Sequence, residues 1–184
     1  MGADDLKNRI NIFQSVNNFC KEDYDNLDEC GPLLIPHIEE ITDEFYENLK
    51  SSPETAKYIE GRVEQLKRMH VKWLEDVFKV GMNEVFVENQ LRIGRAHVEA
   101  KVPPLFVAAS LSHMRSVFPR IIEREASGRE ESVASLVGTC LKMLDLCQYL
   151  IDYSYEQDRF KRITCATGLS LPLLENLISL KPRS

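Results

Sequence analysis

The fold is decided by the stretch LRIGRAHVEAKVPP, residues 91–104, which carries one inward histidine on a helix and then stops at two prolines. Four residues in and just before it recur at steps of four, three and four: Phe86, Gln90, Ile93 and His97. In a helix this spacing places all four side chains on one face. We therefore expect His97 to end a mostly apolar stripe that faces the protein interior.

Two interpretations of His97 follow from this position. Gly94 lies three residues earlier on nearly the same side, and its missing side chain would let a flat ligand approach the backbone. On that interpretation His97 holds a planar ligand. Alternatively, His97 is a core histidine whose ring is hydrogen-bonded to a backbone carbonyl. The stretch alone leaves both interpretations open.

Composition and charge indicate a globular protein with one main domain. The 184 residues are enough for a full hydrophobic core, and 43% of them are hydrophobic while 28% are charged. The net charge is −6, with 23 basic residues interspersed among 29 acidic ones. Because phosphate binding needs a concentrated positive stripe, this pattern argues against nucleic acid as a partner.

Cysteine usage and the first residues indicate a cytoplasmic setting. The five cysteines are odd in number and include no CxxC pair, which favours reduced thiols over a disulfide framework or a zinc site. The start, MGADDLKNRI, has no apolar signal core, and no unbroken apolar run reaches the roughly 20 residues that span a bilayer. We expect a soluble, cytoplasmic chain, which a downstream membrane or signalling region could tether.

The chain is predicted to be almost entirely helical, because apolar periodicity is helical throughout and no alternating strand pattern occurs. Glycine and proline stops divide it into segments. The predicted ranges are 4–19, 21–30, 33–50, 54–60, 62–79, the helix that ends at the double proline, 104–126, 130–163 and an apolar tail in 164–184. Cys140 and Cys147 are expected to be small core residues.

A second histidine lies at the centre of an apolar stripe in helix 62–79. The stripe has spacings of three, four, four and three residues and consists of Val63, Leu66, His70, Leu74 and Val77. The sequence has no phosphate-binding or hydrolase motif, and no Glu-x-x-His, His-x-x-x-His or CxxCH pattern. Two inward imidazoles, His70 and His97 on successive helices, could hold a flat iron macrocycle between them.

Several motifs then resemble one known family. IGRAHVEAKVPPLFVAASL is similar to the IGxxHxxxxxxP stretch of globin-coupled sensors, and EFYENL, RMHVKWLEDVF and the long final helix come in the matching order. The resemblance covers about residues 20–165. It implies an all-α globin fold with an extra N-terminal helix and a sensory role. The implied cofactor is haem b, held non-covalently because CxxCH is absent.

His97 then matches the proximal haem ligand. Tyr46 matches a distal tyrosine that hydrogen-bonds bound oxygen, although it could also be an interfacial tyrosine.

His70 departs from the family pattern, since many members have an apolar residue there. We predict that it is a displaceable sixth ligand opposite His97, which would give bis-histidyl coordination. The competing account has His70 bonded to a haem propionate or a backbone carbonyl, with Tyr46 governing the distal side. His37 and His113 have no identifiable partner and are expected at the surface or in packing. Other haem-lining candidates, which would equally line any core, are Phe45, Leu66, Met69, Leu74, Ile93 and Phe106.

The leading hypothesis is a bacterial haem sensor for O2, NO, CO or redox state, which relays its signal to an output module and is not an enzyme. A redox activity of the haem stays open. The alternative is a haem-free globin-fold interaction module, against which the inward His97 argues. The predicted domains are an N-terminal extension helix (1–20), a globin sensor domain (21–165) and a C-terminal junction (166–184). Apolar positions in 104–126 and 130–163 exceed what one globin layer requires, so we expect a homodimer through these helices.

Overall fold

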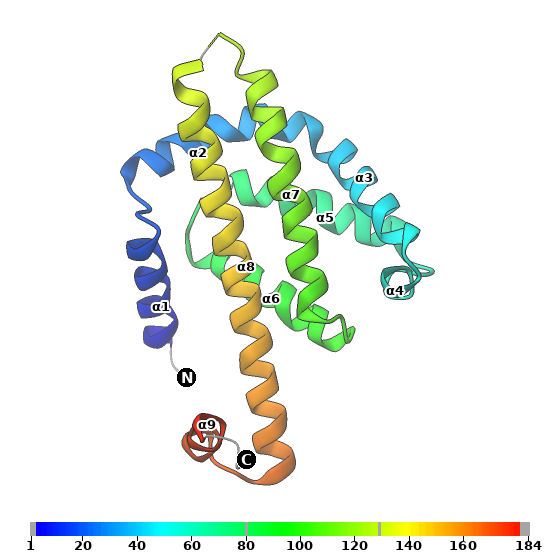
Figure 1. The fold of residues 1–184 in the computed structure, drawn as a ribbon, viewed down its shortest axis with the longest axis vertical. Coiled ribbons are helices and arrows are strands. Elements are labelled where there is room, and N and C mark those ends of the chain that lie inside the picture. The colour runs from blue at the N-terminus through cyan, green and yellow to red at the C-terminus, as the bar shows by residue number, and fades with distance from the viewer. Residues whose placement is uncertain (1–2, 80, 129, 181–184) are drawn as a thin grey trace.

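The structure, a computed structural model, describes residues 3–79, 81–128 and 130–180, and every regular element in these ranges is a helix (Figure 1). The predicted all-α class is therefore confirmed. The elements in chain order are α1 (Ala3–Val16), α2 (Lys21–Leu34), the 3₁₀ helix η1 (Ile35–His37), α3 (Ile38–Ser51), α4 (Pro53–Ala56), α5 (Val63–Lys79), α6 (Glu84–Glu99), α7 (Pro104–Glu125), α8 (Glu130–Thr167) and α9 (Leu171–Ser179).

The longest helix, α8, forms the centre of the fold, and α2, α6 and α7 pack against it. Its 38 residues correspond to about 57 Å of helix, and it runs the length of the molecule in Figure 1. Leu136, Met143 and Leu144 on α8 have no exposed surface. Cys140 and Cys147 are also buried, as predicted. This helix therefore supplies the core against which the other helices are positioned.

By length and composition, residues Ser132–Thr167 of α8 are also apolar enough to cross a membrane, with a mean hydropathy of 1.2 over the most apolar window. The prediction that no segment is long and apolar enough to span a bilayer is therefore wrong for this helix. Half of that window is buried inside the protein, as in the central helix of many soluble folds. A single helix of this kind is weak evidence for a membrane span.

The predicted break at Gly31 and Pro32 is wrong, because α2 continues through both residues to Leu34. Cys30 and Leu34 lie one helical turn apart and have no exposed surface. Their burial on one face favours continuing the helix past Pro32, whose ring removes only one backbone hydrogen bond near the helix end. The next segment begins with η1, which contains Pro36 in its first turn, and α3 follows.

Helix α8 also ends later than predicted, since it continues beyond Ile163 to Thr167. It stops where Gly168 adopts a φ of +72° and its amide donates to the Thr164 carbonyl at 2.9 Å. This left-handed conformation at a helix end favours glycine. The apolar tail then forms α9, which contacts α8 and buries Leu174. Residues 181–184 of the predicted junction lie outside the described residues.

The N-terminal helix α1 packs on the body through the apolar face that its sequence indicates. Leu6, Ile10 and Phe13 are partly buried against the core, and the Phe13 ring lies 4.9 Å from the ring of Tyr149 on α8. The extra N-terminal helix implied by the family resemblance is therefore present. Its contact with Tyr149 places it directly on the central helix.

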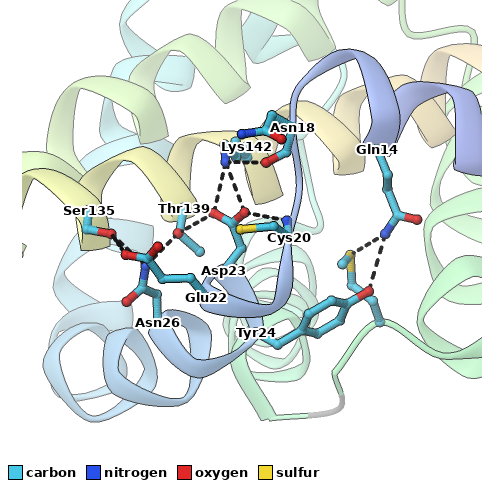
Figure 2. A network of polar contacts seen from close by, with 11 residues as sticks. Gln14, Asn18, Cys20, Glu22, Asp23, Tyr24, Asn26, Ser135, Thr139 and Lys142 are labelled. Carbon is cyan, nitrogen blue, oxygen red and sulfur yellow. Dashed lines mark hydrogen bonds and ion pairs between the residues drawn. The ribbon is translucent and has the colours of Figure 1, made fainter.

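A buried polar network fixes the start of α2 against α8 (Figure 2). Asp23 is 4% exposed and accepts hydrogen bonds from Thr139 at 2.6 Å, Lys142 at 2.9 Å and the Cys20 amide at 2.8 Å. Burial alone would raise the pKa of Asp23, but these hydrogen bonds and the charge of Lys142 lower it below its ordinary value. Lys142 also donates to the Asn18 carbonyl at 3.0 Å. The network ties the connection between α1 and α2 to the central helix.

Candidate functional site

The helix that carries His97 has a defined start and end. Asn83 caps the N-terminus of α6 by accepting a hydrogen bond from the Phe86 amide at 3.0 Å. The helix ends at Glu99, before the double proline, and Lys101 follows in the left-handed region with a φ of +56°. Tyr155 on α8 donates to the Val102 carbonyl at 2.9 Å, which anchors the segment after the helix.

His97 is a half-buried residue whose ring is fixed by its own helix. Its Nδ1 donates to the Ile93 carbonyl at 2.8 Å, one turn earlier. Burial lowers the pKa of His97; the bond to Ile93 raises it in part, and the positive charge of Arg62 lowers it further. The ring is therefore neutral, with its proton on Nδ1 and a lone pair on Nε2. That is the form in which histidine binds a metal.

His70 lies on α5 and is held by α3. Its Nδ1 lies 2.8 Å from Oγ1 of Thr42, which has no exposed surface. The His70 ring stacks on Phe45 with ring centres 5.0 Å apart and an angle of 24°. Burial lowers the pKa of His70 to about 3, and the neighbouring His113 adds to this effect. His70 is therefore also a neutral imidazole near physiological pH.

Tyr46 lies beside His70, on the same side of the site as Phe45. Both α3 aromatic residues are buried, at 6% and 7% exposed, and the ring centre of Tyr46 is 5.9 Å from that of His70. Burial raises the pKa of Tyr46 to about 12, although the charge of Arg62 lowers it in part. The hydroxyl is therefore protonated and can donate a hydrogen bond. The structure thus brings together the two predicted distal residues, Tyr46 and His70, and the lining candidate Phe45.

The two histidine-bearing helices pack mainly on other helices. Within the described residues α6 packs on α8, whereas α5 packs on α3 and α2. A side-chain hydrogen bond joins α5 to α6: Trp73 Nε1 on α5 donates to Gln90 Oε1 on α6 at 3.0 Å, and Gln90 is 2% exposed. Spacing along one helix does not reveal this bond, although a glutamine within an otherwise apolar stripe is a signal for a buried polar partner.

The remaining lining candidates differ in their surroundings. Leu66, Ile93 and Phe106 are partly buried, and the Phe106 ring lies 6.0 Å from that of Tyr58, which the sequence analysis did not single out. Met69 is 58% exposed, whereas Leu74 has no exposed surface and belongs to the core. The lining of a ligand site by these residues stays a prediction.

The interpretation of Gly94 as an approach for a flat ligand is wrong. A Cβ at this position would lie 2.5 Å from Cβ of Ser154 and 2.9 Å from the Ile151 carbonyl oxygen, both on α8. Ser154 also donates to the Leu91 carbonyl at 2.9 Å. Gly94 therefore faces α8, and its missing side chain allows the close packing of α6 on α8.

The other two histidines lie in different environments. His37 has a partner that the sequence did not reveal, because its Nε2 lies 3.1 Å from Glu125 Oε1 at the end of α7. The ring of His113 on α7 lies 6.0 Å from that of Phe45, and its buried Nε2 has no hydrogen-bond partner among the described residues. Leaving such an atom unpaired costs about 1–3 kcal/mol. His113 is therefore an unexpected polar neighbour on the side of Phe45 and His70.

The thiols and carboxylates do not form a separate metal centre in the part of the chain that the structure describes. No group of three or more His, Cys, Asp or Glu side chains there is placed to hold a metal ion. All five cysteines are free thiols, as predicted, and Cys20 and Cys165 are exposed. Burial raises the pKa of the Cys30 thiol to about 12, so this cysteine is an unreactive core residue.

Comparison with known proteins identifies the family. The family model described as Protoglobin matches residues 6–161. The structure is similar to the globin domain of a globin-coupled sensor from Geobacter sulfurreducens, with a TM-score of 0.72 and 25% identity over 79% of this chain and 96% of that one. Ferric and ferrous structures of the globin domain of E. coli DosC give TM-scores of 0.63 and 0.62 at 13% identity. They cover 78% and 77% of this chain and 97% and 95% of theirs, and at that identity they show the fold alone. The chain therefore belongs to the Protoglobin family and has the globin fold of globin-coupled sensor domains.

Proposed function

We propose that the chain is a haem-binding globin sensor domain that detects O2, NO, CO or redox state. Membership of a globin family implies haem, and the matched sensor domain from Geobacter supports the sensory role. The single observation that carries the proposal is the His97 ring, whose Nδ1 is held by Ile93 so that the unprotonated Nε2 is available to a metal. The absence of a CxxCH pattern supports non-covalent haem b.

The donor set of the described residues fits such a group. His97 and His70 are two neutral imidazoles. His97 lies on α6, which packs on α8, and His70 lies on α5, which packs on α3 and α2, with the ring of Phe45 stacked on its own. Each imidazole has its Nδ1 engaged in a hydrogen bond, so Nε2 is the nitrogen that could bind a metal; in His70 this requires that Nδ1 carries the ring proton. When bound, haem supplies an iron that takes up a diatomic gas or changes oxidation state.

His70 is proposed as the sixth, displaceable ligand. Of the partners considered from the sequence, a backbone carbonyl is not the one found, because Nδ1 bonds the Thr42 hydroxyl. Displacement of His70 by a gas would require its ring to leave Thr42 and Phe45, and α5 would move with it. Such a movement is a two-state element that a ligand can bias. Tyr46 is then the donor available to the incoming ligand.

Partner surfaces are proposed separately from the haem site. The predicted homodimer through 104–126 and 130–163 has limited support, since the large apolar residues exposed on α7 and α8 among the described residues are Leu105 and Ile163. More exposed apolar side chains lie in and just after α9: Leu173, Leu177, Ile178 and Leu180. We propose these for contact with a downstream output module, in a cytoplasmic setting. Light scattering at micromolar concentration tests the dimer, and a monomer alone would contradict it.

The absorption spectrum of the purified protein tests the function. After haem-supplemented expression, the oxidised and reduced protein should show one b-type haem per chain and a ferric spectrum typical of two histidine ligands. A colourless protein under these conditions would contradict the proposal. It would favour the alternative of a haem-free interaction module, for which the exposed residues of α9 are the supporting observation.

A further inference from the structure

Thr42 contacts the candidate ligand His70 through its hydroxyl group. Oγ1 of Thr42 lies 2.8 Å from Nδ1 of His70, and Thr42 has no exposed surface. A threonine hydroxyl within a helix commonly donates to the carbonyl one turn earlier. Among the described residues Thr42 forms no such bond, and Nδ1 of His70 is the hydrogen-bond partner of its hydroxyl.

The two ring nitrogens of His70 have different surroundings, and Nδ1 is the one that faces Thr42. Phe45 stacks on one side of the ring, and Trp73 on α5 lies 5.4 Å away, centre to centre. Nε2 of His70 forms no hydrogen bond with another described residue. It is also not fully buried. Nδ1 is therefore the held end of the ring, and Nε2 is the end that a ligand can reach.

A hydroxyl can donate or accept, so two proton arrangements fit the same heavy-atom positions. In the first, the Thr42 hydroxyl donates to Nδ1 and the ring proton is on Nε2. In the second, Nδ1 carries the proton and donates it to Oγ1, which leaves the lone pair on Nε2. Only the second arrangement can bind a metal through Nε2. Rotation of the Thr42 hydroxyl keeps the bond in both.

We propose that Thr42 is a positioning residue that accepts the Nδ1 proton of His70 when Nε2 is the ligating atom, and thereby sets how strongly His70 binds as the sixth haem ligand. The inference rests on the proposed haem function. An acceptor for the Nδ1 proton orients a histidine ligand and increases its basicity, and loss of such a partner typically weakens metal binding by roughly 10- to 100-fold. Thr42 therefore controls how often the distal side is open to a gas.

A matched pair of variants separates this role from packing. Thr42→Val keeps the shape of the side chain and removes the hydroxyl, whereas Thr42→Ser keeps the hydroxyl and removes the methyl group. If Thr42 accepts the Nδ1 proton of the ligating His70 ring, Thr42→Val should shift the ferric haem protein from low spin towards high spin and increase the apparent gas affinity by roughly tenfold. Thr42→Ser should resemble the wild type. If Thr42 only packs, Thr42→Ser should have the larger effect.

Nitrogen NMR of the haem-free protein provides a second measurement. In histidine-labelled wild type, the Nδ1 resonance of His70, assigned by its loss in His70→Leu, should have the shift of a hydrogen-bonded nitrogen. It should move to the unbonded value in Thr42→Val and stay in Thr42→Ser. An Nδ1 shift that is unaffected by Thr42→Val would overturn the inference.

The outcomes distinguish this inference from the proposed function. If the wild type binds haem but its spin state is the same in Thr42→Val, the inference fails and the haem function stands. If the wild type takes up no haem, the proposed function fails, and the role of Thr42 in ligation fails with it even when the NMR shows the bond. A high-spin shift confined to Thr42→Val supports both.

Discussion

Trp73 on α5 donates a hydrogen bond to Gln90 on α6 at 3.0 Å, and this bond connects the helix of His70 to the helix of His97. Gln90 is 2% exposed, so its amide depends on this partner rather than on water. The bond therefore acts as a fixed point between two helices that otherwise pack on different neighbours.

Trp73→Phe should lower the stability of the protein. It keeps an aromatic ring but leaves Gln90 Oε1 buried without a donor, which costs about 1–3 kcal/mol in the free energy of unfolding. Denaturant unfolding followed by circular dichroism measures this change. Lys72→Met, at an exposed position on the same helix, serves as the control and should change stability by about 0.5 kcal/mol or less. Equal stability of Trp73→Phe and the wild type would show that the bond does not contribute.

The histidines should differ in their effect on haem retention. His97→Ala should sharply reduce bound haem, because it removes the proposed proximal ligand, and any haem that stays would depend on His70. His70→Leu should retain haem but lose the low-spin ferric spectrum. His37→Ala is the control, since His37 pairs with Glu125 outside the site. Pyridine haemochrome content and the ferric absorption spectrum give both readouts, and a high-spin wild type that His70→Leu leaves unchanged would exclude coordination by His70.

The stability of the haem-free protein should fall in acid. Folding lowers the pKa of His70 from 6.5 to about 3, so between these values the unfolded chain binds a proton that the folded chain does not. The free energy of unfolding should therefore be level above about pH 6.5 and decrease as the pH falls below it. The lowered pKa of His97 acts in the same direction.

The variant His70→Phe tests the source of this acid sensitivity. It removes the titrating ring while keeping an aromatic side chain, so the slope of unfolding free energy against pH should become shallower between about pH 6.5 and 4. The slope is the readout, because the substitution also changes packing. The same slope in both proteins would mean that His70 is not the neutral buried group described here.

Gly94→Ala should destabilise the protein, whereas Gly138→Ala should not. An added Cβ at Gly94 would lie 2.5 Å from Cβ of Ser154, so α6 and α8 would have to separate, at a cost of about 1–3 kcal/mol. Gly138 is also helical but has nothing within 4 Å of an added Cβ, and alanine there should be neutral or stabilising by about 0.4–1 kcal/mol. Thermal unfolding of the two variants measures the difference. Similar melting temperatures would contradict the close contact of the two helices.

Local periodicity predicted the helices and their inward faces well, because both depend on nearby residues. The helix from 62 to 79 and the positions of His70 and His97 on partly buried faces came from spacing alone. Periodicity could not reveal which helix each face meets. Gly94 was therefore assigned to a ligand, although its true neighbour, Ser154, lies on a helix that is distant in sequence.

Polar residues within apolar stripes mark the buried hydrogen bonds between helices. Thr42 follows Ile38 by four residues and precedes Phe45 by three, so it lies on the inward face of α3, like Gln90 on α6. Each of these two residues pairs with a side chain on α5. Their partners depend on how α3 and α6 lie against α5, and this cannot be read from any single helix. The end of α2 was missed for a related reason, because the burial of Leu34 overrides the local effect of Pro32.

The unbroken course of α8 has a mechanical consequence. From Ser154, where it touches Gly94, the helix continues without interruption to Thr167, over about 20 Å. Because Gly94 admits no Cβ, α6 cannot slide along α8 without forcing a larger side chain into the contact, so rocking about that contact is the motion available to it. Because α8 is one continuous helix, a change in its tilt at Ser154 would displace its end at Thr167 sideways. The first break in the helix after the contact is at Gly168, and a reorientation of α6 would be passed through it to α9.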